Sequence, residues 1–93
     1  MEVNEQIITG VKKNDRKVIL RLYEATFNLL MSVAVRYYNQ REEQMEIVNS
    51  TFLKVIDKID QYEEGTNFYA WVKKISQNTV IDHFRSNKKY KET

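Results

Sequence analysis

Residues 68–85 read FYAWVKKISQNTVIDHFR, and this stretch decides the fold. It contains no glycine or proline, the residues that most often interrupt helices. Small or apolar side chains recur in it at intervals of three and four, the stripe of a helix that packs on a core. The spacing predicts a helix from about Phe68 to Lys88. Its core-facing positions are predicted to be Val72, Ile75, Thr79 and His83.

The segment before this helix is predicted to be a loop that ends in a cap. Residues 62–66 include Gly65, which can adopt positive φ without strain. Either Thr66 or Asn67 can cap the helix, because a side-chain oxygen there accepts hydrogen bonds from free amide groups. Phe68 follows directly and is expected to face the core.

Further upstream, residues 46–56 read EIVNSTFLKVI and form part of a second amphipathic stretch. The residues Asn39-Gln40-Arg41-Glu42 place a capping residue three positions before a glutamate, which is typical of a capping box. A helix is therefore predicted from Asn39 to about Gln61. Its core stripe is predicted to be Met45, Val48, Phe52, Val55, Ile56 and Ile59.

Two more helices are predicted in the first part of the chain. One is short, from Val3 to Lys12, and the other runs from about Asp15 to Tyr38, with Asn14 or Asp15 as its cap. The core stripe of the longer helix is predicted to be Ile19, Leu22, Tyr23, Leu30, Val33, Ala34 and Tyr37.

Composition supports a helical fold. The chain has 93 residues, two glycines and no proline, whereas strand-rich folds need many turns and draw on those residues. We therefore expect an all-α, compact bundle of about four helices in a single domain, residues 1–93. The chain has no cysteine and no signal peptide, which favours a cytoplasmic location. The best apolar run, residues 29–35, is too short for membrane insertion.

Charge is divided between two segments. Residues 42–64 hold seven acids and two lysines, a net charge of −5, and residues 67–93 hold six bases and two acids, a net charge of +4. The two segments are either solvated faces or surfaces for two different partners, the basic one being nucleic acid.

Two faces are not explained by a core. On the third helix, one polar face carries a single leucine. This face is either ordinary solvent-exposed surface or a protein-docking surface. Its residues are Glu46, Asn49, Ser50, Leu53 and Asp57. On the fourth helix, one arc combines an aromatic ring with amide and charged groups that can contact bases. Its residues are Trp71, Lys74, Asn78, Asp82 and Arg85. Trp71 serves there either as a stacking plane or as core filling, and Lys88 and Lys89 suit phosphate contacts.

Nothing in the chain indicates catalysis. His83 is the only histidine, no cysteine is present, and no glycine-rich phosphate loop occurs. We therefore predict that the protein is not an enzyme and that it has no metal site and no cofactor.

Taken together, the third and fourth predicted helices resemble region 2 of sigma-70 family transcription initiation factors, particularly the short extracytoplasmic-function type. The resemblance is carried by residues 46–56 and 68–85, with the same order, spacing and loop length, and it covers roughly residues 5–90. It implies docking on the clamp coiled coil in the largest subunit of core RNA polymerase, through Glu46, Asn49, Ser50 and Leu53. It also implies recognition and melting of the −10 promoter element, held as the non-template strand. The residues implied in that role are Asn67, Trp71, Lys74, Asn78, Asp82 and Arg85.

The sequence departs from the family pattern in two respects. The family favours glutamine and glutamate where Asn49 and Ser50 stand. Family members usually also carry a second, helix-turn-helix domain, which this sequence lacks. The chain is therefore either truncated or an unusual single-domain member, and we expect truncation. We expect a monomer when free, and an anti-sigma factor is a further partner that the resemblance implies.

Two other functions remain open from the sequence. One is a helical adaptor without a DNA role, which has no need for Trp71, Asn78 and Arg85 on one arc above a lysine cluster. The other is a binder of duplex DNA, which the loop before the fourth helix fits poorly.

Overall fold

The computed structural model describes residues 5–63 and 65–91, and for residues 87–91 it describes only the helical backbone. The chain forms α1 (Glu5–Lys12), α2 (Arg16–Tyr37), α3 (Arg41–Asp57), a 3-10 turn η1 (Ile59–Gln61) and α4 (Phe68–Lys91). The predicted all-α bundle is confirmed across the described residues. The predicted start of the first helix, Val3, lies outside the described residues, and α4 continues beyond the predicted end at Lys88.

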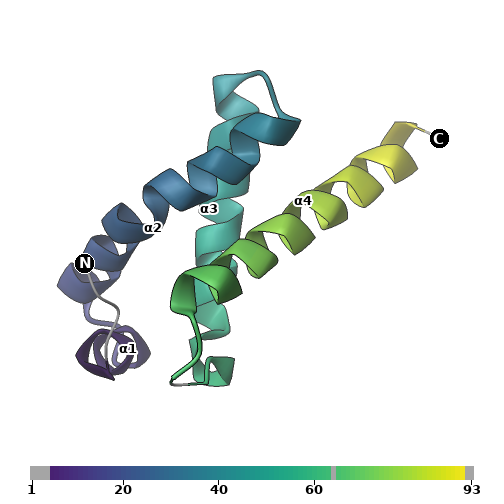
Figure 1. The fold of residues 1–93 in the computed structure, drawn as a ribbon. Coiled ribbons are helices and arrows are strands. Elements are labelled where there is room, and N and C mark those ends of the chain that lie inside the picture. The colour runs from purple at the N-terminus through teal and green to yellow at the C-terminus, as the bar shows by residue number, and fades with distance from the viewer. Residues whose placement is uncertain (1–4, 64, 92–93) are drawn as a thin grey trace.

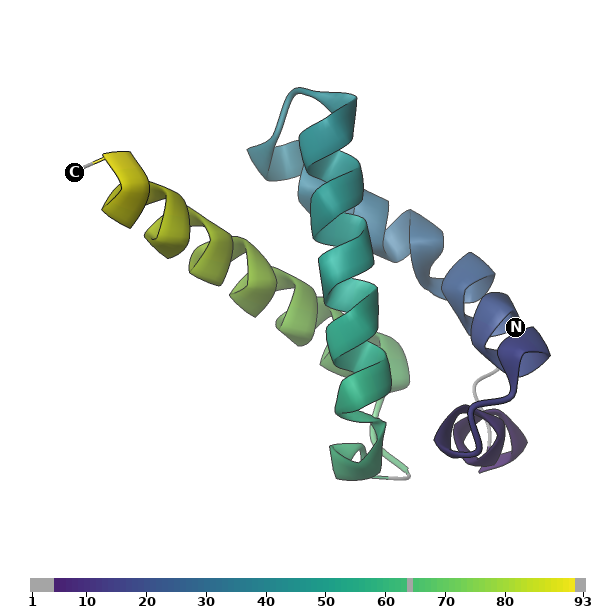
Figure 2. The same ribbon diagram turned by 180° about the vertical axis from the view of Figure 1, so that it is seen from behind.

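The three long helices pack on one another, and α1 closes one end of the bundle against α2 and η1. Figure 2 shows α3 in front, crossing α2 and α4, which lie behind it. In Figure 1 the carboxyl-terminal end of α4 extends away from the other helices. The outer sides of α3 and α4 are among the surfaces that this arrangement leaves exposed.

The core lies where α2, α3 and α4 meet. Six of its side chains are almost completely removed from solvent: Leu22, Leu30, Ile47, Val48, Val55 and Val72. Burying each side chain of this size contributes about 1.5–3 kcal/mol. Two buried threonines satisfy their hydroxyls within their own helices, Thr26 at the Leu22 carbonyl (2.9 Å) and Thr79 at the Ile75 carbonyl (2.8 Å).

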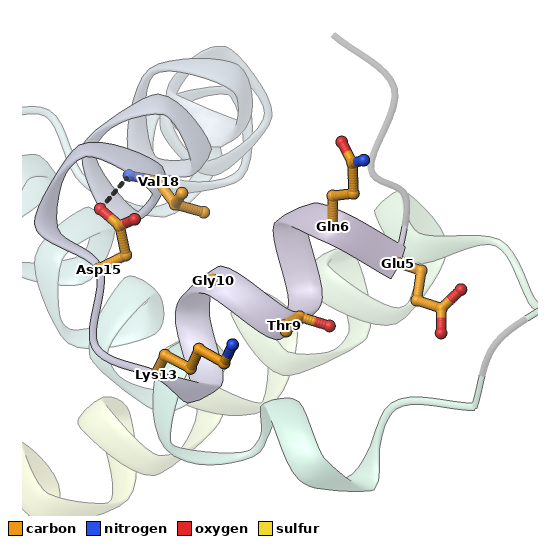
Figure 3. A pocket seen from close by; sticks show the side chains of 7 residues that line it. All are labelled: Glu5, Gln6, Thr9, Gly10, Lys13, Asp15 and Val18. Atoms are coloured by element: carbon orange, nitrogen blue, oxygen red, sulfur yellow. Dashed lines mark hydrogen bonds between the residues drawn. The ribbon is translucent and has the colours of Figure 1, made fainter.

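The join between α1 and α2 is tight. Asn14 has φ of 61°, the left-handed conformation that ends α1, and Asp15 caps α2 as one of the two predicted candidates. The Asp15 carboxylate accepts from the amides of Lys17 (3.0 Å) and Val18 (3.5 Å). Figure 3 shows the shallow hollow of about 420 Å³ that this join forms, with the Asp15–Val18 bond beside Gly10.

Gly10 allows the close approach of α1 to α2. A Cβ at this position would lie 2.8 Å from both Cγ atoms of Val18, which is closer than packed side chains allow. Because valine is branched at Cβ and stiff, it cannot easily move aside.

The predicted capping box at residues 39–42 is wrong. The N-cap of α3 is Gln40, and no side chain caps it. The Gln44 side chain instead donates to the Tyr38 carbonyl at 2.8 Å, which ties α3 back to the end of α2. The predicted third helix is also divided, because α3 ends at Asp57 and η1 follows.

Tyr37 was predicted in the core, and this prediction is also wrong: Tyr37 is 47% exposed, whereas Tyr38 is 7% exposed. The helix ends at Tyr37, and Tyr38 adopts an extended conformation (φ −132°, ψ 137°). Because the helix ends one residue before the predicted end at Tyr38, the rotation of ~100° per residue stops at Tyr37, and the side chain of Tyr38 enters the core instead. Ile47 is fully buried although the predicted stripe omits it.

Among the described helices, α2 is long and apolar enough to cross a membrane by length and composition. Core helices of soluble bundles meet the same criteria. In α2 the residues Leu22, Leu30, Val33 and Ala34 are buried against the rest of the bundle.

Candidate functional site

The outer side of α4 carries the arc predicted from the sequence. Lys74, Asn78 and Arg85 are exposed, and the buried residues of α4 lie on the neighbouring side of the helix. At ~100° per residue, the arc from Trp71 to Arg85 spans only ~80° around the helix. The structure therefore presents a lysine, an asparagine and an arginine along one exposed strip of α4.

Trp71 lies at the start of the strip and is half-buried. Its ring packs on Tyr62 (centroids 5.3 Å apart) and on Phe68 (5.7 Å), and Phe68 is buried as predicted. Part of the Trp71 ring therefore anchors the loop, and the rest remains accessible; its role as a stacking plane stays a prediction.

The loop before α4 is held by its own hydrogen bonds. The Tyr62 hydroxyl donates to the Thr66 carbonyl, and the Thr66 hydroxyl donates to the Glu63 carbonyl (2.7 Å). Gly65 has φ of 90°, as its place in the turn requires. The Asn67 side-chain oxygen accepts from the Ala70 amide (3.1 Å), so Asn67 caps α4, and its NH₂ group points away from this hydrogen bond as a donor for a ligand.

Asp82 lies at the edge of the strip, toward α3. Its carboxylate pairs with Lys54 of α3 at 3.5 Å. Because Asp82 is the only acid in α4, this pairing leaves Lys74 and Arg85 without a competing acid on their own helix. The side chains of Lys88 and Lys89 lie outside the described set, although the backbone of α4 reaches Lys91.

The outer face of α3 carries the second predicted group. Leu53 is the most exposed of the large hydrophobic residues in the described chain, at 68%. It lines a shallow hollow of about 440 Å³ together with Lys54, Ile56 and Asp57. Asn49 and Glu46 are exposed one and two turns before Leu53, respectively, and Ser50 is half-buried.

Neighbouring helices hold two of these polar side chains in place. The Tyr23 hydroxyl of α2 donates to Asn49 Oδ1 at 3.0 Å. On the other side, Glu46 Oε1 lies 3.3 Å from His83 Nε2 of α4. The outer face of α3 is therefore tied to both flanking helices.

His83 also contacts Tyr38, a link that the sequence analysis missed. The Tyr38 hydroxyl lies 2.6 Å from His83 Nδ1, so a chain of polar contacts runs from the end of α2 through α4 to Glu46. Burial, followed by the charges of Glu43 and Glu46, raises the pKa of Tyr38 above its usual 10.0. The Tyr38 hydroxyl therefore keeps its proton and is placed to donate to Nδ1.

Across the described residues, no group of three histidine or carboxylate side chains could hold a metal ion. What the two surfaces offer is recognition by hydrogen bonds, charge, stacking and apolar contact.

Comparison with known proteins shows what these surfaces belong to. Residues 22–90 match the family described as Sigma-70 region 2. The chain is also similar to the RNA polymerase sigma-H factor of Pseudomonas aeruginosa, with 21% identity over 82 residues. That alignment covers 88% of this chain and 42% of the relative, so the chain spans less than half of that protein. No solved structure matches the chain.

Proposed function

The chain belongs to the Sigma-70 region 2 family, and from this we propose that it docks on core RNA polymerase and recognises and helps to melt the −10 promoter element. The family is one of non-enzymatic transcription initiation factors. We place the chain in the extracytoplasmic-function type, acting in the cytoplasm, with residues 1–93 forming a single region 2 domain.

The observation that carries the proposal is the outer strip of α4. It combines exposed basic side chains and the amide of Asn78 with the accessible part of Trp71. The only acidic residue of the strip, Asp82, is paired with Lys54. A strip of this kind suits a negatively charged strand with unpaired bases. Asn78 and Arg85 are the side chains able to make directed contacts to base edges, and Lys74 suits phosphate.

Melting follows from this arrangement without a chemical step. Extruding a base from a duplex costs a few kcal/mol. Stacking it on an aromatic ring recovers ~1–3 kcal/mol, and phosphate contacts add affinity that does not depend on sequence. Because Trp71 is fixed by Tyr62 and Phe68, it offers a stacking plane that needs little ordering on binding.

For the polymerase, the proposed contact is the face around Leu53. An exposed leucine beside a hollow and flanked by carboxylates suits an apolar contact ringed by charges. We propose the clamp coiled coil of the largest subunit as this partner. An anti-sigma factor would compete with the polymerase for the protein, and we expect the free protein to be a monomer.

The two faces are linked by the Lys54–Asp82 and Glu46–His83 pairs. Lys54 borders the hollow and Glu46 belongs to the docking face, whereas Asp82 and His83 lie on α4. Docking that displaces either α3 side chain would therefore alter the charge next to the α4 strip.

The test begins with selection from a random pool of single-stranded DNA by the protein bound to core polymerase. Fluorescence anisotropy then compares the enriched strand with a scrambled version. Weak, salt-dependent binding with a preference for the enriched strand is expected, and Trp71→Ala and Asn78→Ala should reduce that preference. An equal affinity for both strands would show that the strip does not read sequence, and would favour an adaptor whose α3 face alone binds a partner.

A further inference from the structure

A second aromatic surface lies farther along α4. Of the large hydrophobic side chains exposed in the described residues, Ile81 (46%) and Phe84 (44%) lie one turn apart on α4. The exposed ring of Tyr37, at the end of α2, contacts Phe84 edge to face with centroids 6.0 Å apart. We call these three residues the aromatic step.

The aromatic step is rigidly supported from beneath. Phe84 also packs on Tyr38, with centroids 5.5 Å apart and planes inclined by 31°. Tyr38 is itself buried and is held through its hydroxyl at His83. The ring of Phe84 is thus fixed on one side by buried neighbours and remains open on the other.

Arginines flank the step in the sequence. Exposed Arg36 precedes Tyr37, and exposed Arg85 follows Phe84. Asp82, the one acid of α4, is turned to Lys54 instead. Exposed aromatic rings next to basic side chains are the combination that binds single-stranded nucleic acid. The core of a protein-docking patch is instead depleted in charged residues.

We propose that the aromatic step is a second base-stacking site, which takes an unpaired nucleobase of the same strand that passes Trp71. The inference rests on the proposed function and extends it. Phe84 lies 13 residues after Trp71, ~20 Å along the helix at ~1.5 Å per residue. At ~3.4 Å per stacked nucleotide, this rise alone corresponds to about six nucleotides. At ~100° per residue the two side chains also lie ~140° apart around the helix, so the path between them spans at least that many.

The route between the two sites is marked by side chains of the same strip. Lys74 and Asn78 lie next to Trp71 on the helix surface, and Ile81 lies between them and Phe84. A strand crossing α4 obliquely would meet these groups in that order. The sites are therefore parts of one path.

The experiment uses the enriched strand, whose sequence fixes the register, with a single abasic position moved along it. Fluorescence anisotropy is measured with the full chain in complex with core polymerase. Two positions at least about six nucleotides apart should each lose about fivefold or more in affinity, the lower end of the value of one stacked base. The loss at one position should disappear in Trp71→Ala, and the loss at the other in Phe84→Leu.

Phe84→Leu keeps an apolar side chain but removes the ring, and Phe84→Trp keeps a stacking plane. Binding should weaken in the first variant and be retained in the second, and Leu20→Ala, at an exposed leucine of α2, serves as the matched control. Circular dichroism should show all three variants folded. A 5-iodouracil placed at the second position should crosslink to Tyr37 or Phe84.

Three results would overturn the inference. If only the position near Trp71 is sensitive, the second site does not exist and the proposed function stands. If Phe84→Leu abolishes self-association and leaves strand affinity unchanged, the step holds a second copy of the chain. If no strand is enriched by the unaltered complex, the proposed function fails and the second site fails with it.

Discussion

Leu53→Asp separates docking from folding, because Leu53 is 68% exposed on the free protein. Fully burying a leucine contributes about 1.5–3 kcal/mol, so roughly two thirds of that value, ~1–2 kcal/mol, is left for a partner to gain. An aspartate would also place a carboxylate in the contact, and a buried polar group without a partner costs a further ~1–3 kcal/mol. Binding of core polymerase should therefore weaken by at least ~30-fold.

The cost to the fold should be far smaller. Only about a third of the leucine is buried, and aspartate lowers helix propensity by ~0.5 kcal/mol near the end of α3. The free energy of unfolding should fall by about 1 kcal/mol. Biolayer interferometry with immobilised core polymerase measures the first quantity, and urea denaturation followed by circular dichroism measures the second.

Leu20→Asp is the matched control, since Leu20 is 57% exposed on α2. It should reproduce the small loss of stability and leave polymerase binding unchanged. Two results would refute the reasoning. If Leu53→Asp unfolds the protein, Leu53 belongs to the core; if it binds polymerase as tightly as the unaltered chain, the docking surface lies elsewhere.

Three further predictions concern the scaffold and are read from urea denaturation. Gly10→Ala should lower the free energy of unfolding by up to ~2 kcal/mol, because its Cβ would meet Val18; Val18→Ala in the same chain should relieve part of that clash. Ser76→Ala should raise the free energy of unfolding by about 1 kcal/mol, since the Ser76 hydroxyl is buried and has no hydrogen-bond partner among the described residues. An unchanged or lower free energy of unfolding would show that the hydroxyl is satisfied and would contradict this prediction. Tyr38→Phe should lower it by ~0.5–1.5 kcal/mol through loss of the bond to His83. The raised pKa of Tyr38 also means that its contribution is fully present below pH 10.0 and is lost as pH rises through the folded pKa, so the variant should show a weaker decline in stability at alkaline pH.

The spacing of apolar residues predicted most of the buried positions, but it failed at the end of α2. The stripes of α2 and α4 follow a regular turn, so Leu22, Val72 and Thr79 could be placed in the core from spacing alone. Tyr37 and Tyr38 could not, because the extended conformation of Tyr38 resets the direction of its side chain. Ile47 was missed because helices pack on both sides of α3, which widens its buried face beyond one stripe.

For the candidate site, spacing was sufficient to find side chains that point away from the core. Leu53 and Asn78 are exposed because each lies on its helix away from the buried stripe. The contacts between elements could not be predicted in this way. Tyr38 and His83 are 45 residues apart in the chain, and Glu46 and His83 are 37 apart. Only the packing of α2, α3 and α4 brings these groups together.

The most direct measurement of the central claim is opening of a duplex. A duplex carrying the enriched sequence, with 2-aminopurine at its most conserved adenine among the selected strands, reports unstacking by a rise in fluorescence. The account predicts a rise when both core polymerase and the protein are present, a smaller rise with Trp71→Ala, and none with core polymerase alone. A signal unchanged by the protein, or identical for Trp71→Ala and the unaltered chain, would contradict it.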